Sequence, residues 1–400
     1  MPGYIERLLK KDAASGMLLM LSAAMAMFLA NDLILGPFYF DLLDLPIQFR
    51  IAEFDIHKPL LLWVNDGLMA IFFLVIGLEV KEEICHGSLS SLQGAMLPII
   101  AAVGGMVVPA TIYVLFTLNS PEFLNGWAVP AATDIAFALG IMMLLGKRVP
   151  TSLKVFLLAL AISDDLGAIL IIALFYSGKI SMAALGWSVV AMGALFILNR
   201  RRYSGLTPYL FFGLLLWTAV LKSGLHATLA GVVVGFFMPM NGREGDSPLA
   251  HMKQYLYPFS NFFILPVFAF VNAGVDLSGV SLSFLASPIS LGIMLGLFLG
   301  KPLGIFCFSM LAVRLGIAEL PQGANRTQLF ATSSLCGIGF TMSIFISSLA
   351  FVEAATLSQS RLAILGGSFA SALAGYYLLW HSTRERQQAL IQAEVGASVK

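Results

Sequence analysis

Apolar segments of nearly equal length dominate this sequence of 400 residues. Each has roughly 17–25 residues, the length that an α-helix needs to cross a hydrocarbon core ~30 Å thick. Inside lipid, such a chain can pair the hydrogen-bonding groups of its backbone only by forming helices. The sequence therefore predicts an all-α polytopic membrane protein. We place twelve transmembrane helices at about 13–30, 59–80, 95–117, 123–145, 151–176, 182–199, 205–221, 224–240, 255–273, 290–313, 327–350 and 358–380.

Composition excludes the common soluble classes. Hydrophobic residues make up 58% and charged residues 11% of the chain, whereas soluble domains average roughly 25% charged residues. The net charge of +1 gives no support to a nucleic-acid partner. The three cysteines lack the spacing of a metal site or disulfide framework, and nucleotide-binding and hydrolase motifs are absent from the sequence. We therefore expect neither a cofactor nor an enzyme.

The distribution of basic residues predicts the orientation. Most of the 23 lysines and arginines fall in loops on the same side as the two termini, which places both termini in the cytoplasm. We predict a cytoplasmic N-terminus at 1–12, one membrane transport domain at 13–382 and a cytoplasmic tail at 383–400. The basic flank of the first segment also fits a signal peptide, but its length and the eleven segments that follow favour an uncleaved helix.

The longest outer loop, 31–58, contains a possible strand. Residues 46–53 alternate between apolar and polar side chains, which is typical of a β-strand. A small extracytoplasmic β-hairpin here would offer an edge to a second protomer. An irregular loop fits the same residues.

Charged residues inside the predicted helices are the strongest functional signal. A charge at the centre of a membrane helix costs about 2.5–3.5 kcal/mol on insertion scales. One interior lysine cannot neutralise four interior acids, so some of the acids must hold protons or cations, although any single one could be a structural pair. The interior charges are Asp66, Asp134, Asp164, Asp165 and Lys301, and His226 lies near a helix start.

Two of the predicted helices contain breaks. Pro130 removes a backbone donor from the fourth helix, and Thr133 and Asp134 can cap the groups that it frees. Gly337 and Gly339 interrupt the eleventh. Broken helices present opposed partial charges at mid-membrane, where transporters bind ions. Two ordinary kinked helices are the alternative.

Adjacent carboxylates suit cation and proton exchange. Asp164 and Asp165 in low dielectric resist double ionisation and titrate as a pair. Their oxygens suit a small hard cation such as Na⁺ or Li⁺, which would expel up to two protons on binding. Lys301 could neutralise one of them. An intramembrane aspartyl protease needs its aspartates on separate helices, and a channel fits broken helices less well; a Na⁺-coupled symporter of a small solute stays the nearest alternative.

Five motifs together resemble the NhaA-type sodium/proton antiporters of the bacterial inner membrane. They occur in the family's order and the likeness runs from about residue 10 to 382. The motifs are GLEVK (77–81), ATDIAF (132–137), SDDLGA (163–168), GKP (300–302) and GIGFT (337–341).

The resemblance implies a fold and a set of residue roles. Helices 3–5 and 10–12 would be inverted repeats, with the broken helices 4 and 11 crossing. Asp164 and Asp165 would bind Na⁺ or H⁺, supported by Thr133, Asp134 and Lys301. A homodimer held partly by the 45–58 loop and a role in sodium and pH homeostasis are also implied. The family's pH-responsive cluster maps to Glu79, Glu82 and Glu83, and we add His226 as a further candidate.

Overall fold

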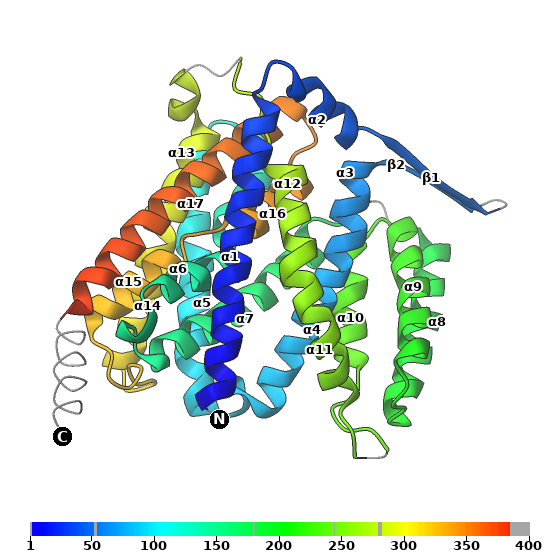
Figure 1. Ribbon diagram of the computed structural model, residues 1–400, viewed down its shortest axis with the longest axis horizontal. Coiled ribbons are helices and arrows are strands. Elements are labelled where there is room, and N and C mark those ends of the chain that lie inside the picture. Colours follow the sequence, from blue (N-terminus) through cyan, green and yellow to red (C-terminus); the bar gives the residue numbers. More distant parts are fainter. Residues whose placement is uncertain (1, 52–53, 179–180, 244, 279–281, 385–400) are drawn as a thin grey trace. The chain divides into compact units, whose positions relative to one another are not determined.

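The computed structural model describes residues 2–51, 54–178, 181–243, 245–278 and 282–384. Most of it is helical (Figure 1). The chain divides into two compact units by its internal contacts. The first unit consists of Met1–Met17, Ser91–Gly167 and Ser281–Lys400, and the second of Leu18–Ser90 and Ala168–Val280. Two helices, α1 (Pro2–Ala30) and α7 (Thr151–Phe175), contribute to both units. Most of the predicted tail, 383–400, lies outside the described residues.

The first unit is formed by α-helices with short 3-10 and π-helical turns between them. Helix α17 packs along α13 and α15, and α5 packs against α14 (Figure 1). The α-helices are α5 (Leu92–Thr117), α6 (Ile135–Leu144), α13 (Pro288–Leu295), α14 (Lys301–Arg314), α15 (Arg326–Leu335), α16 (Phe340–Ala350) and α17 (Ala354–Ser382). The 3-10 helices are Pro121–Ala131, Gly146–Arg148 and Leu282–Ala286, and the π-helical turn is Gly296–Gly300.

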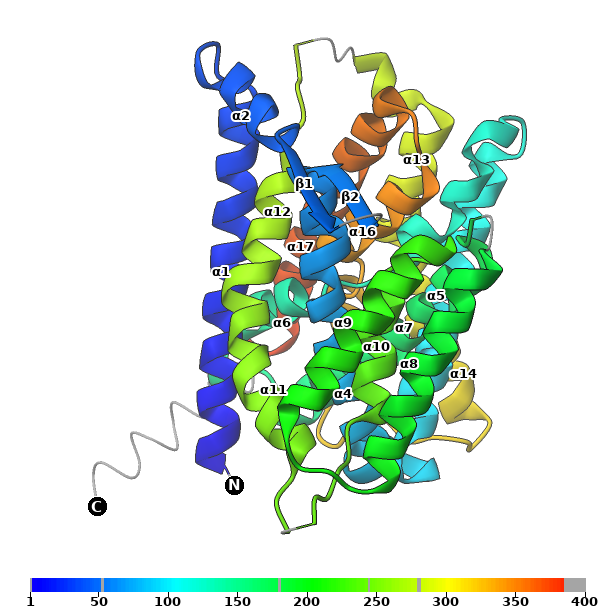
Figure 2. The same cartoon turned by 90° about the vertical axis from the view of Figure 1, so that its right-hand side faces the viewer.

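The second unit combines helices with one small sheet. Helices α8, α9 and α10 lie side by side, and α10 packs on α4 (Figure 2). Its helices are α2 (Leu35–Leu43), α3 (Leu60–Trp63), α4 (Met69–His86), α8 (Met182–Arg200), α9 (Leu206–Ser223), α10 (Thr228–Phe237), α11 (Pro248–Phe259) and α12 (Leu265–Ala273). The shorter turns are Val64–Leu68, Ser88–Ser90 and Ser260–Ile264.

The two strands of the second unit pair with each other. β1 (Pro46–Ile51) and β2 (Phe54–Pro59) run antiparallel, with Pro46 opposite Pro59 and Ile51 opposite Phe54. The indole N–H of Trp63 donates to the Ile47 carbonyl at 3.1 Å and ties the sheet to α3. The residues that join the strands, 52–53, lie outside the described part of the chain.

Length and hydropathy confirm a polytopic helical membrane protein. Among the described residues, eight helices are long and apolar enough to cross a membrane, and up to eleven if each of three bent pairs is one span. Helix α10 is apolar but has only 10 residues, which is short of the length that a span needs. The count of twelve stays a prediction.

Glycine permits two very close helix contacts. A Cβ atom on Gly104 of α5 would lie 2.4 Å from the carbonyl oxygen of Gly304 on α14. A Cβ atom on Gly231 of α10 would lie 2.0 Å from the carbonyl oxygen of Ala70 on α4. Small residues at such crossings let helix backbones approach in a membrane, where van der Waals packing drives association.

Candidate functional site

Two adjacent aspartates lie in the middle of α7, and both side chains are buried. Asp164 and Asp165 are each 3% exposed. Neighbouring residues of a helix project about 100° apart, so the two carboxylates leave α7 in different directions. A carboxylate in apolar surroundings needs an opposite charge, a proton or a bound cation.

Lys301 supplies the opposite charge at Asp164. Its Nζ lies 2.6 Å from Asp164 Oδ2, and the two side chains are 1% and 3% exposed. The same ammonium group donates to the carbonyl oxygen of Ala131. Lys301 begins α14 directly after the π-helical turn Gly296–Gly300, a kind of turn that is frequent at functional sites. Asp164 Oδ1 has no hydrogen-bond partner among the described residues, so it is able to take a proton or contact a cation.

Thr133 and Asp134 lie where one helical segment stops and another begins. The 3-10 helix Pro121–Ala131 and α6 are bent by 45° relative to each other. Ala132 between them is extended, with ψ at 154°. Pro130 cannot donate a backbone hydrogen bond and therefore favours an interruption here. The break falls at 132–134, just after the proline.

A second break faces the first within the same unit. Helices α15 and α16 are bent by 48°, with residues 336–339 between them. The Asp134 N–H donates to the Ile338 carbonyl at 2.7 Å. The Thr133 hydroxyl donates to the Cys336 carbonyl at 3.0 Å. Each break thus supplies partners for polar groups that lipid could not satisfy.

Asp134 accepts hydrogen bonds from the first turns of α6 and α16, the two helices that follow the breaks. Its Oδ1 accepts the N–H of Phe137 at 3.0 Å, which caps the start of α6. Its Oδ2 accepts the N–H of Thr341 at 3.1 Å and the Thr341 hydroxyl at 2.5 Å, in the first turn of α16. A helix N-terminus carries a partial positive charge, and here two of them face one carboxylate. Both oxygens of the Asp134 carboxyl group are thus used by the helix starts that follow the breaks.

The glycines of the second break leave no room for a side chain. A Cβ atom on Gly337 would lie 2.4 Å from the Leu297 carbonyl oxygen. A Cβ atom on Gly339 would lie 2.1 Å from the Ser343 hydroxyl. Gly337 therefore requires glycine because its neighbour is backbone, whereas a side chain at position 339 would have to displace the Ser343 hydroxyl.

Comparison with known proteins identifies the family to which this arrangement belongs. The family model described as Na⁺/H⁺ antiporter 1 matches residues 6–379. The chain belongs to this Na⁺/H⁺ antiporter family. The Na⁺/H⁺ antiporter NhaA of Aeromonas salmonicida is 57% identical over 97% of this chain and 98% of its own length. The Na⁺/H⁺ antiporter NhaA of Yersinia enterocolitica is 56% identical over 95% and 97%.

Membership of the NhaA family confirms the resemblance seen in the sequence motifs. The family consists of membrane transporters, so the chain is a transporter and not an enzyme. Its Asp164, Lys301, Thr133 and Asp134 all lie in the first compact unit, where α7, α14 and the two breaks meet.

The acidic residues expected to respond to pH lie in the second unit. Lys253 Nζ on α11 is 2.6 Å from Glu82 Oε2 and 3.7 Å from Glu79 Oε1, both on α4. Glu83 accepts hydrogen bonds from the N–H and hydroxyl of Ser88, at 2.7 and 2.8 Å. The structure thus joins Glu79 and Glu82 through one lysine and directs Glu83 to the next turn.

His226 does not join this acidic group. It lies between α9 and α10, where its Nε2 contacts the Tyr176 carbonyl oxygen at 2.5 Å. The C-terminal end of α10 is the end that meets the acidic group, since Lys81 Nζ donates to the carbonyl of Phe236 at 2.7 Å. His226 precedes the opposite end of α10, so the four predicted residues form no single cluster.

Asp66 forms an ion pair that the sequence does not predict. Lys58 Nζ lies 2.6 Å from Asp66 Oδ2, with side chains 30% and 26% exposed. Lys58 lies at the end of the predicted outer loop 31–58, and the spacing of residues does not predict its contact with the π-helical turn Val64–Leu68. Asp66 is therefore paired and partly exposed, and the interior lysine does not have to serve it.

Two serines that support the breaks were not predicted. The Ser343 hydroxyl donates to the Val129 carbonyl at 2.7 Å, which joins α16 to the end of the 3-10 helix. The Ser368 hydroxyl on α17 accepts the N–H groups of Gly339 and Phe340 at 3.2 and 3.1 Å. Serines are common in membrane helices, so only their position against broken backbone distinguishes these two.

Proposed function

We propose that this chain is a secondary antiporter that exports Na⁺, or Li⁺, in exchange for inward H⁺. The observation that carries the proposal is the buried Asp164–Lys301 pair beside Asp165, close to two interrupted helices. The relatives described above are all named Na⁺/H⁺ antiporters, which leaves the symporter alternative without support.

Competition for the two carboxylates gives exchange. A cation that binds Asp164 and Asp165 must displace the Lys301 ammonium from Asp164 and any proton from Asp165. In the state that the structure shows, Lys301 neutralises Asp164. When both carboxylates instead carry protons before the cation binds, one Na⁺ releases up to two protons. Such exchange moves net charge and responds to membrane voltage.

The finer architecture belongs to the same proposal. We infer twelve spans, with α10 as the eighth and the pairs at both breaks counted as single crossing helices, four and eleven. Helices 3–5 and 10–12 would be inverted repeats in one transport domain, 13–382. We also infer an inner-membrane protein with both termini cytoplasmic and a homodimer held in part by an extracytoplasmic β1–β2 sheet. Sodium and pH homeostasis would be its role, with Glu79, Glu82, Glu83 and His226 tuning the pH response.

Proton flux in proteoliposomes tests the exchange. Purified protein is reconstituted with a pH-sensitive dye inside, and a Na⁺ gradient is applied with and without a potential set by K⁺ and valinomycin. We expect Na⁺ movement to drive protons the opposite way, at a rate that changes with the potential. Protein-free liposomes are the control. Voltage-independent exchange would contradict two protons per cation, and proton flux without Na⁺ dependence would contradict antiport.

A further inference from the structure

Two prolines lie inside α5, and each removes a hydrogen bond from that helix. Proline has no backbone N–H, so the carbonyl four residues earlier loses the partner that an α-helix gives it. The prolines are Pro98 and Pro109, and the carbonyls are those of Gly94 and Gly105. Gly105 and Pro109 are both buried, and the core of a bilayer offers no water to replace the lost bond.

The face of α5 that carries Gly105 lies against the helix of Lys301. Gly105 and Pro109 are four residues apart, so they are neighbours on one face of α5. A Cβ atom on Gly105 would lie 2.8 Å from Ile305 Cγ1 and 3.9 Å from Lys301 Cε. A Cβ atom on Gly300 would lie 2.9 Å from Pro109 Cα. The carbonyl of Gly105 points along the helix toward Pro109, so it lies between these two contacts.

Lys301 has one more N–H donor than the acceptors that it contacts. An ammonium group has three N–H donors. Among the described residues, Lys301 Nζ donates to Asp164 Oδ2 at 2.6 Å and to the carbonyl oxygen of Ala131. Its side chain is 1% exposed, so water does not supply the third acceptor. A carbonyl without its helical donor and an ammonium with a remaining N–H therefore lie on the two sides of one helix contact.

We propose that the Gly105 carbonyl receives the Lys301 ammonium when Na⁺ takes its place at Asp164. This rests on the proposed function, in which a cation displaces the ammonium from Asp164. Because Lys301 Cε already lies beside Gly105, rotation about the outer bonds of the side chain moves the ammonium onto the carbonyl oxygen. The ammonium keeps its charge and its hydrogen bonds, whereas a buried charge without partners would oppose Na⁺ binding.

Pro109 is a positioning residue in this exchange of partners. It touches neither the cation nor Asp164, and it acts on the ion site by leaving the Gly105 carbonyl free of a helical donor. Proline in a membrane helix is tolerated where neighbouring helices satisfy the freed backbone groups. Here the neighbouring helix supplies a group that does so only while Na⁺ is bound.

Pro109→Ala tests the proposal because it restores the N–H that bonds to Gly105 in an α-helix. Alanine keeps the Cα and Cβ atoms with which Pro109 meets Gly300, so the contact between the helices is preserved. Na⁺-driven proton flux is measured in proteoliposomes over a range of Na⁺ concentrations. We expect the KM for Na⁺ to rise about tenfold, the factor that corresponds to 1.4 kcal/mol. The maximal rate should be retained, because Na⁺ binding and not a later step is weakened.

Pro98→Ala is the matched control in the same helix. It also replaces a buried proline by alanine, but the bond that it restores goes to Gly94, which is exposed near the start of α5. Its KM for Na⁺ should equal that of the parent protein. Pro109→Gly supplies the same N–H as Pro109→Ala and should give the same rise in KM, which keeps the test valid if the alanine variant does not fold.

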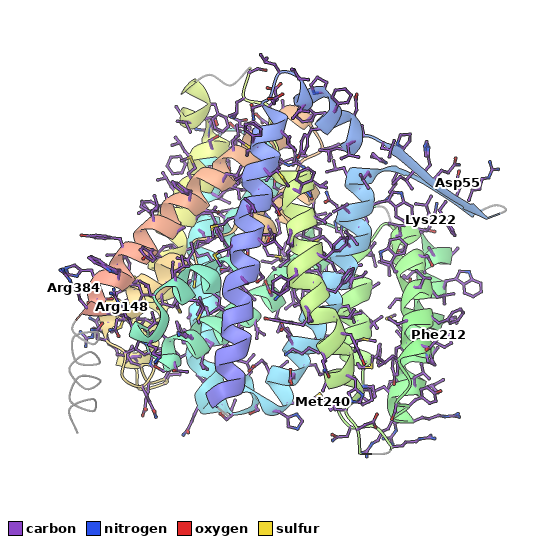
Figure 3. All side chains as sticks on the ribbon, in the orientation of Figure 1. Asp55, Arg148, Phe212, Lys222, Met240 and Arg384 are labelled. Carbon is purple, nitrogen blue, oxygen red and sulfur yellow. The ribbon has the colours of Figure 1, made fainter. Side chains whose placement is uncertain are left out.

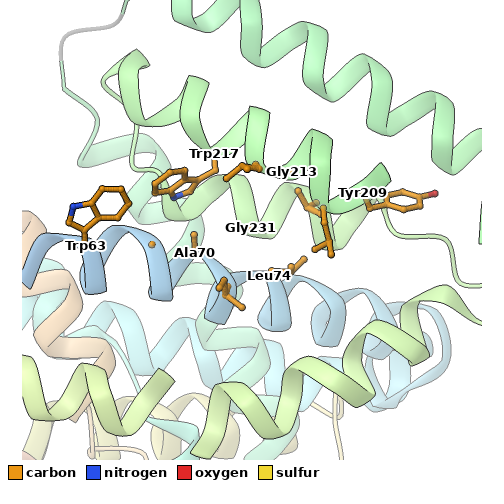
Figure 4. A pocket seen from close by; sticks show the side chains of 12 residues that line it. Trp63, Ala70, Leu74, Tyr209, Gly213, Trp217 and Gly231 are labelled. Carbon is orange, nitrogen blue, oxygen red and sulfur yellow. The ribbon is translucent and has the colours of Figure 1, made fainter. Parts of the chain in front are cut away.

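Two variants of the second unit control for a general loss of stability. Leu74→Ala shortens a buried side chain of α4 that lines an apolar groove with α9 and α10 (Figure 4). Phe212→Ala shortens a side chain of α9 that packs against the same apolar core (Figure 3). Both should lower the melting temperature and leave the KM for Na⁺ unchanged.

Three results would overturn the proposal. A parental KM in folded Pro109→Ala would exclude the Gly105 carbonyl as an acceptor of Lys301. A rise of equal size in Pro98→Ala would assign the effect to the shape of α5. A lower maximal rate with an unchanged KM would place Pro109 in a later step. A parent protein without Na⁺-dependent proton flux would instead contradict the proposed function, so the two failures are distinguishable.

Discussion

Lys301 and Asp164 form an ion pair of 2.6 Å with both side chains almost completely buried. Lys58 and Asp66 form a pair of the same length with about a quarter of each side chain, or slightly more, exposed. The two pairs have the same chemistry and different surroundings, so they offer a comparison within one chain.

Removing Lys301 should destabilise the protein strongly. Loss of one partner from a buried pair leaves an uncompensated charge, which costs about 3–5 kcal/mol. Lys301→Ala should lower the free energy of unfolding in detergent by that amount, as followed by denaturant titration. Lys58→Ala is the control and should cost about 0–1 kcal/mol, as exposed pairs do. Equal losses in the two variants would mean that burial of the Lys301 pair has no energetic consequence.

Neutralising either site aspartate should stop transport. Asp164→Asn and Asp165→Asn keep the side-chain volume but remove the charge that attracts a cation. In everted vesicles each should abolish Na⁺-dependent proton release, whereas Asp66→Asn should retain it because Asp66 lies with Lys58 in the second unit. Full Na⁺/H⁺ exchange in either of these two variants would contradict the proposed ion site.

Thr341 should matter through its hydroxyl. Thr341→Val keeps the shape and the N–H bond to Asp134 but removes the 2.5 Å hydroxyl bond. A buried acceptor that loses a hydrogen-bond partner costs about 1–3 kcal/mol, so stability should fall by that amount and exchange should slow. Thr341→Ser should behave as the parent, and a valine variant with parental stability and rate would show that the backbone N–H suffices.

Gly104 should not tolerate a methyl group. In Gly104→Ala the new Cβ would lie 2.4 Å from the Gly304 carbonyl oxygen, and backbone cannot yield as a side chain can. We expect overpacking to cost about 1–3 kcal/mol and lower the yield of folded protein in detergent. Gly186→Ala on α8 meets nothing within 4 Å and should be neutral or stabilising. Similar yields and melting temperatures for both would contradict the tight crossing of α5 and α14.

Lys253 should set the pH range of exchange. Its ammonium lies 2.6 Å from Glu82 and 3.7 Å from Glu79 and is a positive charge that the two carboxylates share. Lys253→Gln removes this charge and leaves the two acidic side chains facing each other, so the dependence of Na⁺/H⁺ exchange on pH should change. Lys222→Gln removes the same charge far along the chain and should leave the pH profile in place. A pH profile that Lys253→Gln leaves unchanged would separate this group from pH control.

The apolar helices and the charged positions inside them can be predicted from the sequence because both are properties of single segments. A run of apolar residues predicts a membrane helix wherever it occurs, and the confirmed family explains why the five motifs appear in order. The breaks at 132–134 and 336–339 lie beside the predicted Pro130, Gly337 and Gly339 for the same local reason.

Contacts between residues far apart in the chain could not be predicted from the sequence. The sequence leaves open whether Lys301 contacts an aspartate, and only the folded chain shows that Asp164 is its partner. The pairing of Lys58 with Asp66, eight residues along the chain, is equally invisible in the sequence. His226 is a further candidate for the pH response in the sequence, and the structure places it before the start of α10, at the end away from Glu79.

The hydrogen bonds between the two breaks also determine the order in which parts of the chain can fold during synthesis. Asp134 accepts from Thr341, which is 207 residues further along the chain. At the roughly 5–20 residues per second of translation, the first break waits about 10–40 s for its partner to emerge from the ribosome. During that interval its polar backbone must be held by water, lipid headgroups or the insertion machinery. The last third of the chain therefore decides when the first break, at 132–134, can take its final place in the membrane.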